Sequence, residues 1–378
     1  MMWLTVLLLI VIIICFMLMV IRWSTSKTVP GPIGLPLLGY YPFLGKHPNP
    51  TLHQLADKYG EIMKINLLGE DFYIISSLET VKKVLVKDGE NFMGRPADKF
   101  NLISKLYSNK AYMYSQLEFY KAQRKFLIPK LSLLGITKSD FETRIHELCE
   151  DLVEELRKRQ IITDMGQLLS NVASNVILRL VFNEKYDIND PIYVALLHNV
   201  EIMNETFDYM NATLVGKLFY LKCRLNFRFW RKLISARESL RKFMMSHIKN
   251  RAANKEYPTQ YNDLLDYCLE QSSGPNGQYF EIDTIARIFL LLFFAGTDTT
   301  ASTVFHGITL FAKHPEIQRK LISELEVFDK YSRISFKDVE NLHYTRACIA
   351  EIQRFASSVP LNLVHVNSSQ TISQLFQK

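Results

Sequence analysis

The residues best suited to chemistry lie together near position 300. The stretch "LLLFFAGTDTTAS", residues 290–302, sets Ala295, Gly296, Asp298 and Thr299 inside a run whose apolar positions follow helical spacing from 282 to 311. A carboxylate and a hydroxyl on a helix that is otherwise apolar can pass protons to a bound ligand and hold ordered water in a dry pocket. The carboxylate of Asp298 and the threonine hydroxyls around it are therefore candidates for a proton relay.

The same stretch also has a purely structural interpretation. Glycine weakens a helix by ~1 kcal/mol relative to alanine, and threonine hydroxyls can bond back to carbonyl groups and bend the helix. Burying Asp298 is costly unless it has partners. The sequence thus predicts a long helix that crosses the core, ends before Pro315 and is interrupted near Gly296. At this interruption, Asp298 either belongs to a proton relay or is a structural residue whose carboxylate is hydrogen-bonded within the core.

The elements that must position this helix are mostly helical themselves. Helical spacing recurs in residues 52–60, 78–89, 141–160 and 167–182, and helices dominate from about Glu118 onward. "EIMKINL" and "FYIISS" alternate in hydrophobicity on either side of "LGED", which predicts a β-hairpin. The expected fold class is mostly α with a small β-sheet subdomain.

A membrane anchor is expected at the N-terminus. Residues 3–21 carry no charge, and at ~1.5 Å per residue they span about 29 Å, close to the ~30 Å hydrocarbon core. Arg22 and Lys27 follow, which keeps the body in the cytosol. A cleaved signal peptide is the competing interpretation. We expect an anchor over residues 1–22, a proline- and glycine-rich spacer over 23–45 and one domain over 46–378.

Composition narrows the remaining function classes. The five cysteines show no short C-x-x-C spacing, which argues against a zinc site and a disulfide framework. The net charge is +7, and between residues 217 and 251 eleven basic residues and several aromatic ones accompany a single acid. Such a stretch forms either a solvated helix face or a surface for anionic lipid. No nucleic-acid-binding signature is present, and we expect no nucleic-acid partner.

Several motifs, in order along nearly the whole chain, resemble one family. They are "PGPIGLPLLG" at 30–39, "NFMGRP" at 91–96, "YKAQRKF" at 120–126, "NVASNVILRLVFNEKYD" at 171–187, "AGTDTT" at 295–300 and "EIQR" at 351–354. Together they resemble the cytochrome P-450 family of haem-thiolate monooxygenases, and most closely its microsomal, drug- and steroid-metabolising animal branch. The resemblance implies the cytochrome P-450 fold.

The resemblance also implies cofactors, partners and residue roles. A haem b cofactor would take electrons from NADPH through NADPH–cytochrome reductase and insert one oxygen atom into a lipophilic small molecule, at the endoplasmic reticulum membrane. By position in the family motifs, Asp298 and Thr299 would deliver protons to iron-bound dioxygen, and Ala295 and Gly296 would line the oxygen groove. Arg124 and His365 would contact the haem propionates. Glu351 and Arg354 would give structural support. Tyr120 stands where the family usually has tryptophan.

One family element is not matched. The family's F-x-x-G-x-x-x-C loop supplies the thiolate that binds haem iron, and no cysteine here stands in that context. The resemblance therefore leads us to expect a form truncated before this loop, without a metal ligand of its own, inactive by itself and doubtful in haem binding. The alternative is a non-catalytic, membrane-anchored module that binds lipophilic ligands or the redox partner.

The predicted topology can be tested on the intact chain. Because the uncharged run is followed by basic residues, the protein should resist carbonate extraction from endoplasmic-reticulum membranes, and the region around Tyr261 should be open to protease from the cytosolic side. Three N-x-S/T sequons, at Asn204, Asn211 and Asn367, provide the counter-test. A glycan on any of them would place the body in the lumen and contradict the prediction.

Overall fold

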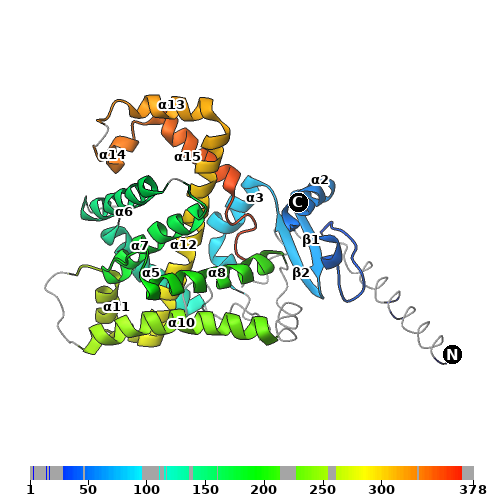
Figure 1. Cartoon of the computed structure of the whole chain (residues 1–378). Helices are drawn as coiled ribbons and strands as arrows, with labels where there is room; N and C mark the ends of the chain where they lie inside the picture. The colour runs from blue at the N-terminus through cyan, green and yellow to red at the C-terminus, as the bar shows by residue number, and fades with distance from the viewer. Residues whose placement is uncertain are drawn as a thin grey trace. The chain divides into compact units, whose positions relative to one another are not determined.

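The computed structural model of the chain describes residues 29–45, 47–95, 117–135, 139–159, 161–212, 227–253, 261–329 and 332–367, with residues 3, 14, 17, 110 and 115. The predicted anchor, residues 1–22, lies almost wholly outside these ranges. Figure 1 shows the helices and strands of the chain, and contacts divide the chain into two units. Unit 1 comprises residues 1–105, 205–231 and 361–378, and unit 2 comprises residues 106–204 and 232–360. Each unit is described by itself.

Unit 1 is built on a β-hairpin. Strand β1 (Ile62–Leu67) pairs antiparallel with β2 (Glu70–Ile75), with Leu67 opposite Glu70. The connection is Leu68 and Gly69, both at positive φ, as a tight hairpin turn requires. This turn is shorter than the predicted "LGED", so β2 begins earlier than expected. The hairpin is confirmed, and it holds all the strands found in the described residues.

The core of unit 1 lies on one face of β1. Side chains alternate along this strand, so that Met63, Ile65 and Leu67 are fully buried. They pack against Leu44 and against α2 (Pro48–Tyr59) through Leu52 and Leu55. Short helical segments complete the unit: η1 (Tyr41–Phe43), α3 (Leu78–Lys82), the π-helical turn η2 (Lys83–Lys87) and η3 (Gly89–Phe92).

Residues 29–45, the later part of the expected proline- and glycine-rich spacer, pack on the hairpin. The Lys64 amide donates to the Pro30 carbonyl at 2.8 Å, and Gly39 forms a bridge with Leu67. Val29 and Leu44 are buried. This segment is therefore an ordered part of unit 1, because its irregular backbone finds hydrogen-bond partners along the hairpin.

Unit 2 is helical. Its elements, some of which extend beyond it, are α5 (Leu117–Leu134), α6 (Ser139–Lys158), α7 (Met165–Phe182), α8 (Pro191–Ala212), α10 (Phe227–Ala253), α11 (Leu264–Ser272), η5 (Gly277–Tyr279), α12 (Ile282–Lys313), α13 (Pro315–Leu325), α14 (Phe336–Val339) and α15 (His343–Ala356). Within the described residues, the predicted class, mostly α with a small sheet, is confirmed.

The centre of unit 2 is the packing of α12 on α7. The rings of Phe182 and Phe289 meet edge to face with centroids 5.4 Å apart, and Ala301 lies against Leu169 and Ala173. Both helices are long and apolar enough to cross a bilayer by length and composition. Their apolar windows are, however, about half buried within the protein, as expected for core helices of a folded domain.

The predicted interruption of α12 is wrong. The helix is continuous from Ile282 to Lys313. The hydroxyls of Thr297, Thr299 and Thr303 donate to the carbonyls four residues earlier, at 2.6, 2.7 and 2.7 Å. Each hydroxyl bonds to a backbone carbonyl that also takes part in the hydrogen bonding of the helix. The threonines therefore satisfy their hydroxyls without breaking the helix.

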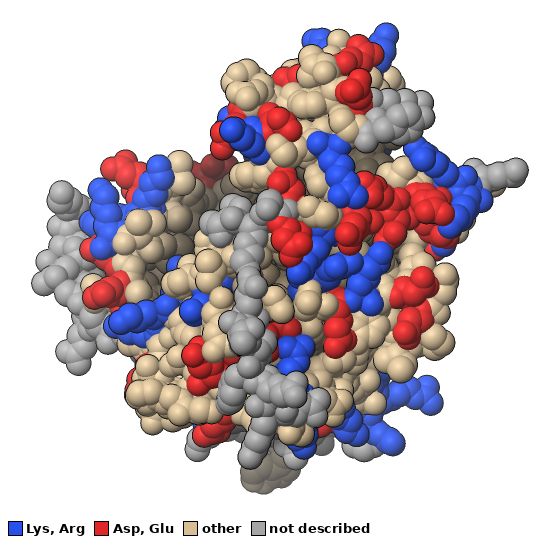
Figure 2. Space-filling model, turned by 90° about the vertical axis from the view of Figure 1, so that its left-hand side faces the viewer, with Lys and Arg blue, Asp and Glu red and all other residues tan. Residues whose placement is uncertain are grey.

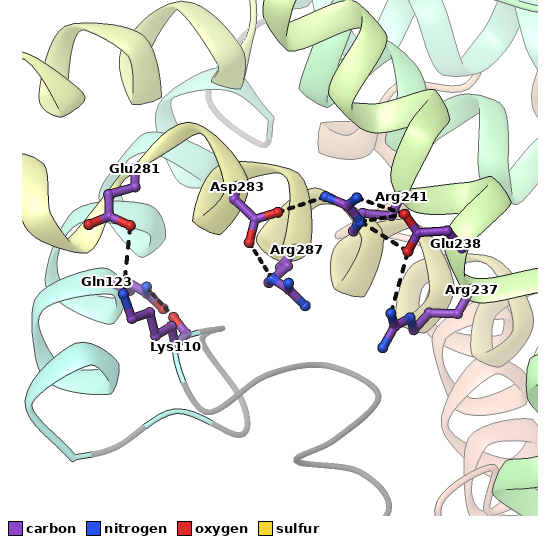
Figure 3. A network of polar contacts seen from close by, with 8 residues as sticks. All are labelled: Lys110, Gln123, Arg237, Glu238, Arg241, Glu281, Asp283 and Arg287. Atoms are coloured by element: carbon purple, nitrogen blue, oxygen red, sulfur yellow. Dashed lines mark hydrogen bonds and ion pairs between the residues drawn. The ribbon is translucent and has the colours of Figure 1, made fainter. Parts of the chain in front are cut away.

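An ion network ties α10 to the first turns of α12 (Figure 3). Arg241 donates to Asp283 and to Glu238, both at 2.7 Å, and Arg287 donates to the second oxygen of Asp283 at 2.7 Å. Burial opposes ionisation of Asp283, but the guanidinium groups of Arg287 and Arg241 lower its pKa overall. Nearby, Lys110 and Glu281 form a looser pair at 3.6 Å, with both side chains about half exposed.

The contribution of Asp283 to stability should depend on pH. Asp283→Asn should lower the free energy of unfolding by about 1 kcal/mol at pH 7, a small value because the side chain is half exposed. Since the folded pKa is lowered, this stability is present above the unfolded pKa near 4 and disappears as pH falls through the folded pKa. Denaturant unfolding at pH 7 and pH 3 measures it.

The matched control is Glu281→Gln, which removes the looser pair at the same end of the helix. Its effect should be close to zero at both pH values. A loss of stability in Asp283→Asn that is equally large at pH 3 would mean that shape, rather than charge, is responsible.

Candidate functional site

Helix α12 presents the candidate oxygen-handling residues on different faces. Ala295 and Thr299 lie one turn apart, both partly buried, and the Thr299 hydroxyl donates to the Ala295 carbonyl at 2.7 Å. Asp298 is exposed, so the expected burial of its carboxylate is wrong. Its position on the helix surface removes the desolvation cost and lets the carboxylate exchange protons with water.

Gly296 faces α7. A Cβ atom on this residue would lie 2.5 Å from Cδ1 and 2.7 Å from Cγ1 of Ile177. The absent side chain is therefore what allows Ile177 to pack against the α12 backbone. The structure brings Ala295 and Thr299 together and directs Gly296 toward the neighbouring helix, which gives this glycine a packing role.

Helix α5 presents Arg124 and Tyr120 at its surface. The Arg124 guanidinium donates to the Tyr120 hydroxyl at 3.3 Å and lies 5.9 Å from the centre of its ring. The helix is fixed from behind by buried Gln123, whose amide donates to the carbonyls of Lys110 and Tyr279. Arg124 thus stands on a rigid element and is exposed enough to reach a carboxylate.

In unit 1 the structure joins His365 to a segment far away in the sequence. Val366 forms a bridge with Gly94, the His365 ring bonds through Nδ1 to the Phe92 carbonyl at 2.7 Å, and Arg95 donates to the Val364 carbonyl at 3.0 Å. Arg95 lies within "NFMGRP", but sequence reasoning gave it no role. Only the bridge between residues 94 and 366 reveals that an arginine stands beside the candidate histidine.

The hydrogen bond to Phe92 fixes which His365 nitrogen carries the proton in the neutral ring. A carbonyl oxygen only accepts, so Nδ1 carries the proton and Nε2 is left for a ligand. Burial lowers the pKa of His365, the Phe92 bond opposes this, and the charge of Arg95 lowers the pKa further. Arg95 is therefore the permanent cation of this pair, and His365 donates through Nε2 only after gaining a second proton.

Glu351 and Arg354 form a two-point ion pair on α15. Both guanidinium–carboxylate contacts measure 2.7 Å, and both side chains are more than half exposed. The pair lowers the pKa of Glu351 and raises that of Arg354. An exposed pair within one helix adds little stability by itself. Its structural role stays a prediction.

The described cysteines do not favour a thiolate. Burial raises the pKa of all three described cysteines, Cys268, Cys149 and Cys348. The charge of Glu150 raises the pKa of Cys149 further, and that of Glu324 raises the pKa of Cys348 further. A thiolate ligand to a metal needs a lowered pKa. Cys15 and Cys223 lie outside the described residues. Within those ranges no cluster of three or more His, Cys, Asp or Glu side chains could hold a metal ion.

Comparison with known proteins identifies the family. The cytochrome P450 family model matches residues 29–374. The chain belongs to the cytochrome P450 family. The match begins at residue 29, so the segment 29–45 that packs on the hairpin falls inside the family domain, which we had expected to start at residue 46.

The curated relatives come from animals. The chain is 30% identical to cytochrome P450 2A9 of Mesocricetus auratus, over 92% of this chain and 71% of that protein. It is 30% identical to cytochrome P450 2H1 of Gallus gallus, over 92% and 72%, and 29% identical to cytochrome P450 2A13 of Homo sapiens, over 98% and 77%. The resemblance to the drug- and steroid-metabolising animal branch is confirmed, and membership supports a haem-binding monooxygenase.

The packing role of Gly296 can be measured with a double-mutant cycle. Alanine in place of glycine usually stabilises a helix by about 0.5–1 kcal/mol, and Gly166→Ala in α7, where nothing lies within 4 Å, should show this gain. Gly296→Ala should be about 1–3 kcal/mol less favourable, because Ile177 must move. The free energy of unfolding is the measurement.

The cycle is completed with Ile177→Ala. In that background the new methyl group has room, so Gly296→Ala should become about as favourable as Gly166→Ala. Additive effects of the two substitutions would show that Gly296 and Ile177 do not touch.

Proposed function

We propose that this chain carries the active-site framework of a membrane-bound haem monooxygenase, which inserts one oxygen atom of dioxygen into a lipophilic small molecule. The observation that carries the proposal is the face of α12 where Ala295 and Thr299 lie one turn apart, in a chain matched to the family over residues 29–374. A small side chain beside a hydroxyl leaves room for a small ligand and provides a group to hydrogen-bond it.

The residues present fit the carboxylates of haem b. Arg124 on α5 donates to the Tyr120 hydroxyl, Arg95 beside His365 donates to the Val364 carbonyl, and guanidinium groups pair strongly with carboxylates. Tyr120 supports Arg124, in the place where the family usually has tryptophan. When bound, haem supplies the iron centre at which dioxygen is activated. We assign no described residue to the iron, because the three described cysteines favour the thiol.

The chain's own residues would move protons in two steps. The exposed carboxylate of Asp298 can take a proton from water. The Thr299 hydroxyl, which donates to the Ala295 carbonyl, can turn its proton toward a ligand while its oxygen accepts from another donor. Gly296 would serve this face indirectly, since its contact with Ile177 fixes the rotation of α12.

Partners and location follow from the same proposal. Lys121, Arg124 and Lys125 are all exposed on α5 and suit an acidic surface, so we propose that NADPH–cytochrome reductase docks there through salt-sensitive contacts. The endoplasmic reticulum membrane is the proposed location, with the anchor in residues 1–22 and the body in the cytosol. Lipid, reductase and a lipophilic substrate are the proposed partners.

A second candidate function is a non-catalytic, membrane-anchored module that binds lipophilic ligands or the redox partner. The observation favouring it is the raised pKa of the three described cysteines, which leaves none of them suited to bind iron as thiolate. The two functions differ in whether the chain holds haem through its arginines and activates oxygen.

Haem titration of the purified 378-residue chain tests the proposal. Arg124→Gln should weaken haem binding on the order of tenfold, the loss expected for one charge-assisted contact. Thr299→Ala should leave the affinity unchanged, because its hydroxyl handles protons rather than the haem carboxylates. Lys130→Gln is the matched control: Lys130 lies on the same helix with its ammonium group over the Tyr267 ring, 4.3 Å from its centre.

The carbon monoxide spectrum of the reduced, haem-loaded chain separates the two functions further. Because burial raises the pKa of each described cysteine, we expect no red-shifted, thiolate-type Soret band. Such a band would show that a cysteine reaches the iron. Haem binding that is weak and equally insensitive to Arg124→Gln and Lys130→Gln would favour the non-catalytic module.

A further inference from the structure

The last turn of α10 and the start of α11 meet in a buried group of charged side chains within unit 2. Asp263, the N-cap of α11, is 1% exposed, and the side chain of Asp266 in the first turn is 3% exposed. Arg251 of α10 reaches both carboxylates with one nitrogen, because Nη1 lies 2.6 Å from Asp266 and 3.1 Å from Asp263. We call these three residues the α10–α11 cluster. It holds two carboxylates for one guanidinium group.

The guanidinium group does not serve the two carboxylates equally. Arg251 donates to Asp266 at 2.6 Å, and its other terminal nitrogen donates to the Phe182 carbonyl at 3.5 Å. Asp263 uses Oδ1 to accept from the Asp266 amide at 3.0 Å, and this bond caps α11. The other oxygen of Asp263, Oδ2, is buried and accepts no hydrogen bond from any residue that the structure describes. Such an oxygen is costly to bury on an ionised carboxylate and much less so on a protonated one.

The groups that act on Asp263 come from both helices of the cluster. Burial has the largest effect and opposes ionisation, as does the charge of Asp266, whereas the Asp266 amide and Arg251 favour it. The Cys268 thiol of α11 adds no charge, because burial raises its pKa. The Lys130 ammonium of α5 lies over an aromatic ring of α11, 4.3 Å from its centre. The balance raises the pKa of Asp263 to about 6.

We propose that the α10–α11 cluster is a pH-sensitive clasp, in which a proton on Asp263 decides how firmly α11 is held to the end of α10. The inference does not depend on the proposed function. With the proton bound, one guanidinium and one carboxylate remain, so the buried cluster is neutral. When the proton leaves, the second negative charge must share a nitrogen that is already bonded to Asp266, and the contact between the helices weakens.

The direction of the pH dependence follows from the raised pKa of Asp263. Its folded value lies above its ordinary value of 3.8, so the stabilisation is fully present in acid and is lost as the pH rises through about 6. The first turn of α11 should therefore open more often at pH 7 than at pH 5. From the two pKa values, the opening equilibrium should differ about tenfold between these pH values.

Hydrogen exchange of the purified 378-residue chain, followed on peptides from α10 and α11, measures the clasp. Each rate is divided into the intrinsic rate at the same pH, which removes the pH dependence of the exchange chemistry itself. The resulting protection of the last turn of α10 and the first turns of α11 should be about tenfold higher at pH 5 than at pH 7.

Two variants identify the group that takes up the proton. Asp263→Asn cannot ionise but still caps the helix, so its protection at pH 7 should rise to the level seen at pH 5 and no longer change with pH. His247→Gln is the matched control, because His247 lies one turn before Arg251 and its ring stacks on Phe182 with centroids 4.7 Å apart. Histidine ordinarily titrates in the same pH range. This variant should keep the tenfold change.

Three results would overturn the proposal. The first is equal protection of α11 at pH 5 and pH 7 in the unaltered chain, a comparison that needs no variant to fold. The second is a pH dependence that survives in Asp263→Asn. The third is a pH dependence that disappears in His247→Gln, which would make the histidine the group that takes up the proton.

Discussion

The close approach of α7 and α12 is the constraint on which the rest of unit 2 depends. With no side chain at Gly296, Ile177 packs directly on the α12 backbone, and this contact fixes how the long helix is rotated about its own axis. Rotation decides which residues face which way. Once Gly296 points to α7, Ala295 and Thr299 must share another face, and Asp298 must lie at the surface. A packing contact thus sets the direction of the groups that would do chemistry.

Charged side chains act mainly through local ion pairs, and the surface does not carry one sign of charge throughout. The face in Figure 2 carries lysine, arginine, aspartate and glutamate side by side, although the chain has a net charge of +7. In the basic stretch before residue 251, Arg241 is engaged by Glu238 and Asp283, and Arg251 by Asp263 and Asp266. Burial raises the pKa of Asp263 to about 6, which shows how closely this last group is enclosed. In the described part of the stretch, these basic side chains therefore form ion pairs within the protein.

Local sequence patterns predicted the helices and strands well. They did not predict contacts between segments that are far apart in the sequence. The alternation in residues 61–77 predicted the hairpin, and helical spacing from 282 predicted α12, because each signal lies within one element. The ordered path of residues 29–45 and the joining of residues 94 and 366 depend on partners elsewhere in the sequence. The prolines and glycines correctly predicted an irregular backbone for residues 29–45. They did not predict that this backbone forms hydrogen bonds with the hairpin. The exposure of Asp298 escaped for the same reason, since it follows from Ile177 on another helix.

The candidate haem-binding residues come from segments that are far apart in the sequence. Arg124 belongs to a helix of unit 2, whereas Arg95 and His365 belong to unit 1, where residues beyond 360 return to pair with residues near 94. A carboxylate-bearing ligand that engages Arg95 and His365 would also stabilise the pairing of residues 94 and 366 within unit 1. Donor groups that are individually exposed, such as Arg124, gain strength when such a ligand excludes water from them. The proposed role of Arg95 and His365 thus depends on the pairing of residues 94 and 366, and the proposed role of Arg124 depends on the buried Gln123 that fixes its helix.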